Sequence, residues 1–273
     1  MKSLQNYFLI LFTFFGVLSW NPVIIDAQEI DHTSVLLLGV DTGDFGRVDQ
    51  GRSDTIMVLD INNKNNEAAL ASIPRDAYVD IPGYGMDKIN HAYAFGGAEL
   101  SMETVNNFLG TQIEDYVVVN MAGLKEIIDA VGTIQVTPPT SFSIGEYSFT
   151  EGVPTELDSD MALAYARERY TSGGDYARQE RQREIILAIV NKAASIESVV
   201  NFIPMFSALS DNINTNLNVV ELMSLFQTYK SLEGIQPYQL SGYGEMIDGV
   251  YYDQIDQESL ANLVDILETG SNE

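Results

Sequence analysis

Residues 35–76 read VLLLGVDTGDFGRVDQGRSDTIMVLDINNKNNEAALASIPRD and contain three short apolar runs separated by polar turns. The runs are Val35–Val40, Thr55–Ile61 and Ala68–Ile73, and their length and aliphatic content are typical of buried strands. Residues 62–67 join the second run to the third and are few enough to make a hairpin the default connection. We expect the first two strands to be antiparallel neighbours as well, so the segment predicts a three-stranded meander.

This meander would bring charged residues from three places in the sequence to one edge of the sheet. The first strand ends, the second begins and the third ends at that edge, beside Asp41, Arg52, Asp54 and Arg75. Carboxylates hold Mg²⁺ through oxygen and guanidinium groups bind phosphate oxygens, so the set is typical of a hard cation bound with a phosphate. Each aspartate taken alone also fits an ordinary turn or cap residue. The two arginines at the same edge favour the functional interpretation.

The rest of the chain alternates strands and helices. Further strands are expected at 115–120 and 133–137, and helical patterns occupy 99–109, 121–130, 158–167, 176–194, 219–229 and 257–267. The pattern predicts one α/β domain in which a central mixed sheet carries helices on both faces.

The composition excludes several classes of protein. With 14 basic and 39 acidic residues among 273, the net charge is −25, which opposes bulk attraction to nucleic acid or to an anionic membrane face. The chain has no cysteine, which excludes disulfides, thiolate metal sites and a cysteine nucleophile. Its two histidines are too few for a multi-histidine metal site.

Most of the arginines cluster in one part of this acidic chain. Five of them lie between residues 167 and 183. Arginine suits bidentate recognition of phosphate or carboxylate, so the cluster indicates a site for a discrete anion. Pairing with neighbouring acids on a solvated helix is an alternative that composition alone leaves equally open.

The spacing within the cluster predicts a helix boundary. Arg167 and Arg169 would diverge by roughly 200° on a continuous helix, so they converge on one anion only if the helix ends there. Gly173 and Gly174 support such a break, and Asp175 is expected to cap the next helix.

On that next helix, Arg178, Arg181 and Gln182 share one face. Arg183 is expected to point away from this face, as a surface residue.

The N-terminus contains an uncharged apolar stretch from Tyr7 to Trp20 that continues to Ile25. Its length approaches that of a membrane span, and the sequence near residues 25–27 is a poor signal-peptidase site. We therefore expect an uncleaved single-pass anchor in residues 1–30 more than a cleaved signal peptide. A domain outside the cytoplasm would then occupy 31–268, and 269–273 would form a flexible tail.

The quoted motifs, taken together, resemble the LytR–CpsA–Psr family of Gram-positive cell envelopes. The matching stretches are VLLLGVD, GRSDTIMVL, SIPRDAYVDIPG, KINHAYAFGG, ALAYARERY and DYARQERQREII, in that order. The resemblance implies a single αβα domain on a membrane anchor. It also implies transfer of an anionic glycopolymer, of the teichoic acid or capsule type, from an undecaprenyl-pyrophosphate carrier to peptidoglycan at the cytoplasmic membrane.

The same resemblance assigns roles to individual residues. Asp41 and Asp54 correspond to metal ligands for Mg²⁺ or Mn²⁺, and Arg75, Arg167 and Arg169 correspond to catalytic, pyrophosphate-binding arginines. Arg178 and Arg52 correspond to further pyrophosphate-binding positions. The loop from residue 44 to residue 51 varies within the family, so Arg47 is an alternative to Arg52.

Alternative functions remain at this level. A polyprenyl-pyrophosphate hydrolase would use the same metal and arginines with water as acceptor, and a membrane-bound transcriptional attenuator would use neither. The acidic charge and the lack of a helix-turn-helix pattern oppose direct DNA binding. A polyprenyl tail would need an apolar tunnel, for which the helical stretches 199–209 and 219–226 are candidates, although ordinary core helices show the same pattern.

Overall fold

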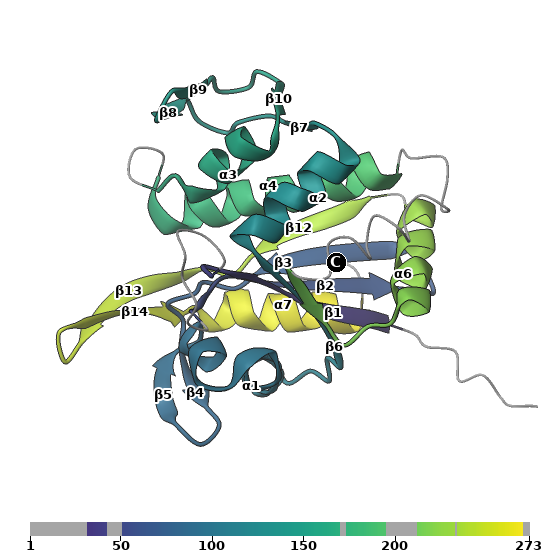
Figure 1. Ribbon diagram of the computed structural model, residues 1–273. Coiled ribbons are helices and arrows are strands. Elements are labelled where there is room, and N and C mark those ends of the chain that lie inside the picture. Colours follow the sequence, from purple (N-terminus) through teal and green to yellow (C-terminus); the bar gives the residue numbers. More distant parts are fainter. Residues whose placement is uncertain (1–31, 43–50, 170–172, 195–211, 233, 270–273) are drawn as a thin grey trace, which may run out of the picture. The chain divides into compact units, whose positions relative to one another are not determined.

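The computed structural model describes residues 32–42, 51–169, 173–194, 212–232 and 234–269 (Figure 1). The predicted anchor in residues 1–30 lies outside these ranges. Within the described ranges, no helix is long and apolar enough to cross a membrane.

Six strands form the central sheet, in the order β11–β6–β1–β2–β3–β12. β1 pairs parallel with β6 and β3 pairs parallel with β12, whereas the other three pairings are antiparallel, so the sheet is mixed, as predicted. Its strands are β1 (His32–Val40), β2 (Ser53–Asn62), β3 (Glu67–Ser72), β6 (Asp115–Asn120), β11 (Ile213–Thr215) and β12 (Ile235–Gln239).

The predicted meander is confirmed. β1 pairs antiparallel with β2, with Val35 opposite Leu59, and β2 pairs antiparallel with β3, with Leu59 opposite Leu70. The register shifts at Gly39 and Val40, where a Cβ at Gly39 would lie 2.8 Å from the Thr55 side chain. The chain therefore leaves β1 and enters β2 at the same edge, as the short apolar runs indicated.

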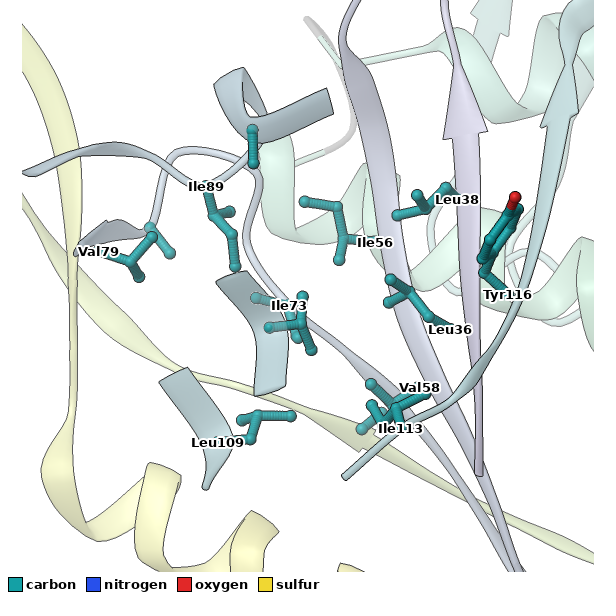
Figure 2. Packing of buried hydrophobic residues seen from close by; sticks show 14 of the residues in the cluster. Leu36, Leu38, Ile56, Val58, Ile73, Val79, Ile89, Leu109, Ile113 and Tyr116 are labelled. Atoms are coloured by element: carbon teal, nitrogen blue, oxygen red, sulfur yellow. The ribbon is translucent and has the colours of Figure 1, made fainter. Parts of the chain in front are cut away.

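One face of the sheet packs against two helices, α1 (His91–Leu109) and α7 (Gln257–Thr269). Side chains alternate across a strand, and those on this face are almost fully buried. Figure 2 shows this core, which is built from aliphatic side chains of the strands and helices. α1 begins at His91, before the predicted residue 99. Gly96 and Gly97 have non-helical φ and ψ angles, and they interrupt the helical pattern of the sequence near its start.

The other face of the sheet lies under a layer of helices, α2 (Met121–Val131), α3 (Ser159–Arg167) and α4 (Gly174–Ala194) (Figure 1). This layer has its own core, to which α6 (Val219–Ser231) adds Phe226. No described residue of the central sheet belongs to that second core. The helices are thus stabilised largely by their own packing, which leaves the facing side of the sheet available.

Eight short strands lie outside the central sheet and pair as hairpins or bridges. β7 (Ile134–Val136) was expected among the sheet strands but pairs instead with β10 (Thr155–Leu157) in the helical layer. The remaining pairs are β4 (Tyr78–Ile81) with β5 (Gly85–Lys88), β8 (Phe142–Ile144) with β9 (Tyr147–Phe149), and β13 (Gly242–Ile247) with β14 (Val250–Ile255).

Candidate active site

The turn after β1 is held to the start of β2 by Asp41. Its Oδ1 accepts a hydrogen bond from the backbone N–H of Arg52 at 2.9 Å, and its own N–H donates to the Arg52 carbonyl at 3.3 Å. Gly51 has φ +65°, and a Cβ there would lie 2.3 Å from Asp41 Oδ1. Only glycine tolerates both the left-handed backbone and this close approach, so the turn is built to present the Asp41 carboxylate.

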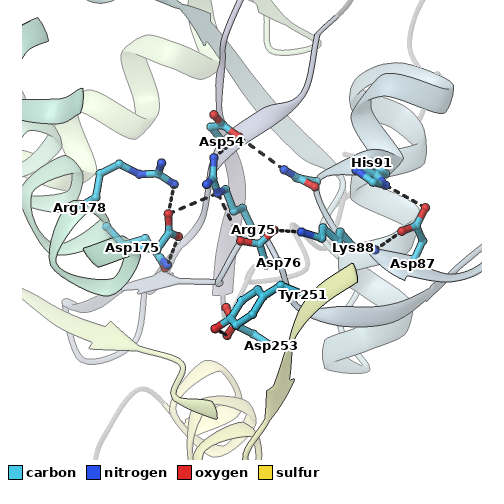
Figure 3. A network of polar contacts seen from close by, with 12 residues as sticks. Asp54, Arg75, Asp76, Asp87, Lys88, His91, Asp175, Arg178, Tyr251 and Asp253 are labelled. Carbon is cyan, nitrogen blue, oxygen red and sulfur yellow. Dashed lines mark hydrogen bonds and ion pairs between the residues drawn. The ribbon is translucent and has the colours of Figure 1, made fainter. Parts of the chain in front are cut away.

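Arg75, just beyond β3, lies among three carboxylates (Figure 3). Its Nη1 is 2.9 Å from Asp54 Oδ1, and its Nε is 3.4 Å from Asp175 Oδ1 and 3.6 Å from Asp76 Oδ2. Burial opposes the charge of Arg75, but the attraction of Asp54, Asp175 and Asp76 outweighs it and raises the pKa of the guanidinium. Arg75 is therefore a fixed, permanently charged donor at the sheet edge.

Arg178 enters the same cluster from α4. Its Nη2 lies 2.6 Å from Asp175 Oδ1, and the residue is only 4% exposed. Burial lowers the pKa of Arg178, and the neighbouring cations Arg75 and Arg169 lower it further, against the attraction of Asp175. Its buried Nε has no hydrogen-bond partner in the described part of the chain. Crowded cations with an unused buried donor favour the binding of an anion.

The end of α3 displays the Arg-x-Arg pair as the sequence predicts. Asp158 caps the helix by accepting a hydrogen bond from the Met161 N–H at 2.8 Å, and the helix ends at Arg167. Glu168 is extended, with ψ 133°, so Arg167 and Arg169 do not diverge as they would on a continuous helix. Both line the cavity described below.

Arg181 holds this helix end in place. Its Nε donates to the Tyr165 carbonyl at 3.1 Å, and its Nη2 donates to the Glu168 carbonyl and pairs with the Glu168 carboxylate. The side chain is fully buried and lies 5.0 Å from the Phe142 ring centroid. Arg181 therefore uses its Nε and Nη2 on the helix end that positions the Arg-x-Arg pair, and unlike Arg178 and Gln182 it does not line the cavity described below.

The expectation that Arg183 is a surface residue is wrong. Its Nη1 donates to Ser72 Oγ at 2.9 Å and to Gln239 Oε1 at 3.1 Å, and burial lowers its pKa. Arg183 ties α4 to the ends of β3 and β12. The helix crosses the sheet here, so a side chain pointing away from the arginine pair meets the sheet instead of solvent.

Asp175 was expected to cap α4, but it lies inside the first turn of that helix. One of its carboxylate oxygens is close to both Arg75 and Arg178. Asp175 therefore links the sheet edge to the helical layer, a role that its position before a helical run did not reveal.

A cavity of about 710 Å³ lies between the sheet and the helical layer. Its polar end is formed by Asp41, Asp54, Arg167, Arg169, Arg178 and Gln182. Its apolar walls come from the sheet face opposite the first core, with Leu37, Leu59, Leu70, Val117 and Val119, and from α4 and α2, with Ile185, Ile186, Ile189, Val190, Leu124 and Ile127. One end of the cavity thus suits an anion and the rest suits a hydrocarbon chain.

The sequence predicted that the helical stretches 199–209 and 219–226 line a tunnel for the polyprenyl tail. Residues 199–209 lie outside the described ranges. α6 contributes Tyr229 to the lining, and no described residue within 219–226 does so. The helix that dominates the apolar wall is α4, which the sequence linked only to arginines.

Most of the predicted site residues converge at the polar end of the cavity. Arg75 is joined to the lining residue Asp54 by its ion pair. The Arg52 side chain is exposed and does not line the cavity as described, and Arg47 lies outside the described ranges. Sequence reasoning missed Asn90, which donates to Asp54 Oδ1 at 3.5 Å, and Lys88, whose Nζ is 2.7 Å from Asp76 Oδ1.

The donor set at the polar end fits a magnesium ion that is shared with a phosphate ligand. Within the described residues, no group of three or more acidic or histidine side chains is placed to hold a metal. Mg²⁺ is commonly held by one or two carboxylates together with substrate phosphates instead of a complete protein cage. Asp41 and Asp54, beside four arginines, supply that number of carboxylates and the cationic surroundings that phosphate requires.

Comparisons with known proteins agree with this site. Residues 18–269 match the model of the LytR_cpsA_psr family. The chain is 48% identical over 242 residues to the polyisoprenyl-teichoic acid–peptidoglycan teichoic acid transferase TagU of Enterococcus faecalis, covering 88% of this chain and 80% of TagU.

Two solved structures are similar as well. The crystal structure of Bacillus subtilis TagU superposes with a TM-score of 0.71 at 36% identity, over 89% of this chain and 98% of that one. TagT bound to LIIa-WTA superposes with a TM-score of 0.75 at 32% identity, over 88% of this chain and 90% of that one. With the meander, the arginine pair and the amphiphilic cavity all in place, these matches show that the chain is an enzyme of the LytR–CpsA–Psr family.

Proposed function

We propose that this protein transfers a teichoic-acid-type glycopolymer from a polyprenyl-pyrophosphate carrier to peptidoglycan. The observation that carries the proposal is the cavity, whose apolar walls adjoin a polar end rich in arginine. A polyprenyl pyrophosphate has the same division, with a long hydrocarbon tail on a compact dianionic or trianionic head. The relatives named as teichoic acid transferases support the choice of polymer.

The apolar walls would bind the polyprenyl tail. Burying each methylene contributes about 0.8 kcal/mol, so about ten buried methylenes contribute about 8 kcal/mol before the costs of ordering. Two or three isoprene units inside the cavity would therefore contribute to holding the carrier, less the cost of ordering the tail. The arginines at the polar end of the cavity would then bind the head group.

The arginines would stabilise the leaving group. An acceptor hydroxyl attacks the phosphorus that carries the glycopolymer and releases its proton to solvent. The bond from that phosphorus to the bridging oxygen breaks, and prenyl phosphate departs with the electron pair. Arg75, Arg167, Arg169 and Arg178 would surround the head group at the polar end of the cavity and neutralise the growing charge. A preorganised donor of this kind contributes roughly 10²–10³ in rate.

Asp41 and Asp54 would hold Mg²⁺, which would neutralise charge on the pyrophosphate oxygens. Asp54 also orients Arg75, so one carboxylate links the metal ligand set to the arginine cluster. Titrating Mg²⁺ into Asp54→Ala and the parent, with a polyprenyl pyrophosphate present, tests this assignment. We expect the variant to lose both activity and cation dependence, and equal cation dependence in the two proteins would refute the ligand assignment.

The activity itself is tested with the full chain in detergent. The protein is incubated with a polyprenyl-pyrophosphate-linked glycopolymer and peptidoglycan oligomers, and the products are analysed by mass spectrometry. We expect a covalent polymer–peptidoglycan conjugate together with prenyl phosphate. Polymer phosphate without conjugate would instead identify a hydrolase.

We also propose that residues 1–30 anchor the protein in the cytoplasmic membrane, with the domain outside. The uncharged stretch from Tyr7 supports this placement. Cell fractionation with intact-mass analysis tests it: the full-length mass is expected in the membrane fraction, and a soluble form that begins near Gln28 would contradict it.

A further inference from the structure

The hairpin of β13 and β14 carries two exposed side chains, Met246 and Tyr251, on one face. In its antiparallel register Met246 lies opposite Tyr251 and Gly244 lies opposite Asp253, so these four residues share a face. The neighbouring positions, among them Tyr243, belong to the other face. Met246 and Tyr251 are exposed, at 63% and 45%. An aromatic and an apolar side chain are thus displayed on a ribbon that extends from the end of the sheet (Figure 1).

The Tyr251 ring is fixed in orientation although nearly half of it is exposed. Its hydroxyl donates to Asp253 Oδ1 at 2.7 Å, and Lys88 Nζ lies 5.9 Å from the ring centroid. The ring lies across Gly244, where a Cβ would be 2.5 Å from a ring carbon. The hydrogen bond to Asp253 and burial raise the pKa of Tyr251, so its hydroxyl stays protonated and neutral. The residue is suited to present a flat surface and not to exchange a proton.

This ring is connected to the catalytic cluster by a short chain of bonds. The Asp253 N–H donates to the Asp76 carbonyl at 2.9 Å, and Lys88 pairs with the Asp76 carboxylate. Asp76 directly follows Arg75 and lies 3.6 Å from its Nε. Figure 3 shows Tyr251 and Asp253 below Arg75 and Asp76, on the side away from Asp54. A molecule that rests on the Tyr251 ring therefore borders the arginine cluster.

We propose that Tyr251, with Met246 beyond it, is the platform on which the acceptor saccharide stacks before transfer. The inference rests on the proposed function, because it assigns the docking site of the second substrate. The C–H face of a pyranose ring is apolar and flat, and an aromatic ring held in one orientation binds it without losing rotamer freedom. The sugar would lie on the Asp76 side of Arg75, across that side chain from Asp54 and the donor head group.

The charge around the platform identifies the saccharide as a neutral one. Lys88, the cation beside the ring, is already paired with Asp76, and Asp253 lies behind the ring. Asp248 in the turn of the ribbon and Glu245 on its other face add negative charge that repels an anionic polymer, whereas the donor head group has the arginines. A membrane surface is the other class of partner for exposed apolar side chains. The same acids and a net charge of −25 oppose contact with anionic lipid headgroups, so the saccharide is the occupant that the charges favour.

The test measures initial rates of the full chain in detergent against acceptor concentration, at saturating donor. Tyr251→Ala is expected to raise the acceptor KM about tenfold with little change in the donor Kd, because one aromatic stacking contact is lost. Tyr251→Phe keeps the ring and should stay within about threefold of the parent. Gly244→Ala, which displaces the ring without removing it, should raise the acceptor KM in the same direction as Tyr251→Ala.

Tyr243→Ala is the matched control, since Tyr243 is 65% exposed on the opposite face of the same ribbon. It is expected to leave the acceptor KM unchanged. Equal effects of Tyr243→Ala and Tyr251→Ala, or a weakened donor Kd in Tyr251→Ala alone, would overturn the assignment.

A second measurement separates this inference from the proposed function. Saturation-transfer NMR with chitotetraose, a neutral N-acetylglucosamine oligomer, reports saccharide binding whether or not any transfer occurs. Signal transfer in the parent and its loss in Tyr251→Ala would support the platform even if the transferase assay failed. Absent signal in the parent, or reduced binding of Tyr251→Ala to phosphatidylcholine vesicles with unchanged chitotetraose binding, would overturn it.

Discussion

Arg75 shows at the scale of one residue how the site combines charge with fixed geometry. Asp54 lies at its Nη1, and Asp175 and Asp76 lie near its Nε, so the planar guanidinium is held from two sides. A lysine ammonium keeps the charge but lacks the two-pronged donor arrangement. We therefore expect the transfer rate to depend on the guanidinium group of Arg75 and not only on its positive charge.

Substitution of arginine by lysine tests that point. We expect Arg75→Lys and Arg167→Lys each to reduce kcat by roughly 10²-fold or more, because a directed donor to the leaving group is lost. Lys64→Ala is the matched control, because Lys64 is an exposed cation in the turn between β2 and β3, at the far end of the sheet. Full activity of Arg167→Lys in the transfer assay would show that the pair has a structural role only.

Substitution of Asp175 should lower the thermal stability of the domain, and a bound anion should restore it. Asp175→Asn leaves the guanidinium groups of Arg75 and the buried Arg178 with less compensating negative charge, at a cost of about 1–3 kcal/mol. For a domain of this size we expect the melting temperature to fall by about 3–10 °C. Because pyrophosphate supplies the missing charge, adding it should raise the melting temperature of the variant more than that of the parent.

Differential scanning fluorimetry makes this measurement. The control is Asp160→Asn, which removes the surface partner of Lys125 from a position 65% exposed. Surface pairs contribute about 0–1 kcal/mol, so this control should change little. If pyrophosphate stabilised Asp175→Asn no more than the parent, the bridge would not be part of the anion site.

At the scale of elements, the junction of α3 and α4 determines whether the arginines converge. Arg181 binds the last carbonyls of α3, and Tyr165 of α3 donates its hydroxyl to Glu184 Oε2 of α4 at 2.5 Å. These contacts hold the two helices together on the side away from the cavity. The geometry of Arg167 and Arg169 is thus a property of the helix pair, not of the Arg-x-Arg spacing alone.

The Glu184 contact predicts a pH dependence of stability. Burial raises the pKa of Glu184, against the opposing effects of Tyr165 and the arginines. The folded state then holds the Glu184 proton more tightly than the unfolded state, so its contribution to stability falls as pH rises from the unfolded pKa of about 4.3 through the raised folded value. Glu184→Gln should remove this loss and be more stable than the parent near neutral pH.

Thermal melts of the parent and Glu184→Gln between about pH 4 and pH 8 check this sign. The gap between the two proteins should widen with rising pH. Glu103→Gln, at an exposed position on α1, is the control and should show no such widening. A Glu184→Gln variant that is less stable at neutral pH would mean that its attraction to Arg181 and Arg183 dominates.

At the scale of the whole domain, the two hydrophobic cores explain why a large cavity is tolerated. One core joins the sheet to α1 and α7, and the other lies within the helical layer. Each layer buries its own side chains, so the space between them need not be filled for the domain to fold. The half-buried aliphatic side chains that face this space are the surface left for a hydrocarbon ligand.

Filling the cavity should discriminate between lipid lengths. Ile186 lines the apolar wall on α4, and Ile186→Trp would occupy space that the tail needs. We expect the KM for a long-chain polyprenyl donor to rise at least tenfold, because several methylenes lose their contacts. The KM for a donor with a very short prenyl chain should change little, and equal losses with both donors would place the tail elsewhere.

The local elements and the identity of the charged residues were predictable from the sequence alone. Aliphatic runs of strand length with a short polar turn predicted the β1–β2–β3 meander, and this placed Asp41, Asp54 and Arg75 at one edge. The spacing of Arg167, Arg169 and the two glycines predicted the end of α3. These inferences succeeded because period-two burial and helix geometry are properties of contiguous residues.

The contacts between elements became known from the fold of the whole domain. Arg183 was expected in solvent but contacts the sheet, Asp175 bridges two arginines instead of capping α4, and β7 joins the helical layer. The cavity likewise depends on the separation of two layers that are distant in sequence. Asp253, which holds the Tyr251 hydroxyl, meets Asp76 only because β14 returns to the end of β3. The physical reason is that such contacts arise from the packing of whole elements against one another, and periodicity along a strand or helix carries no information about its neighbour.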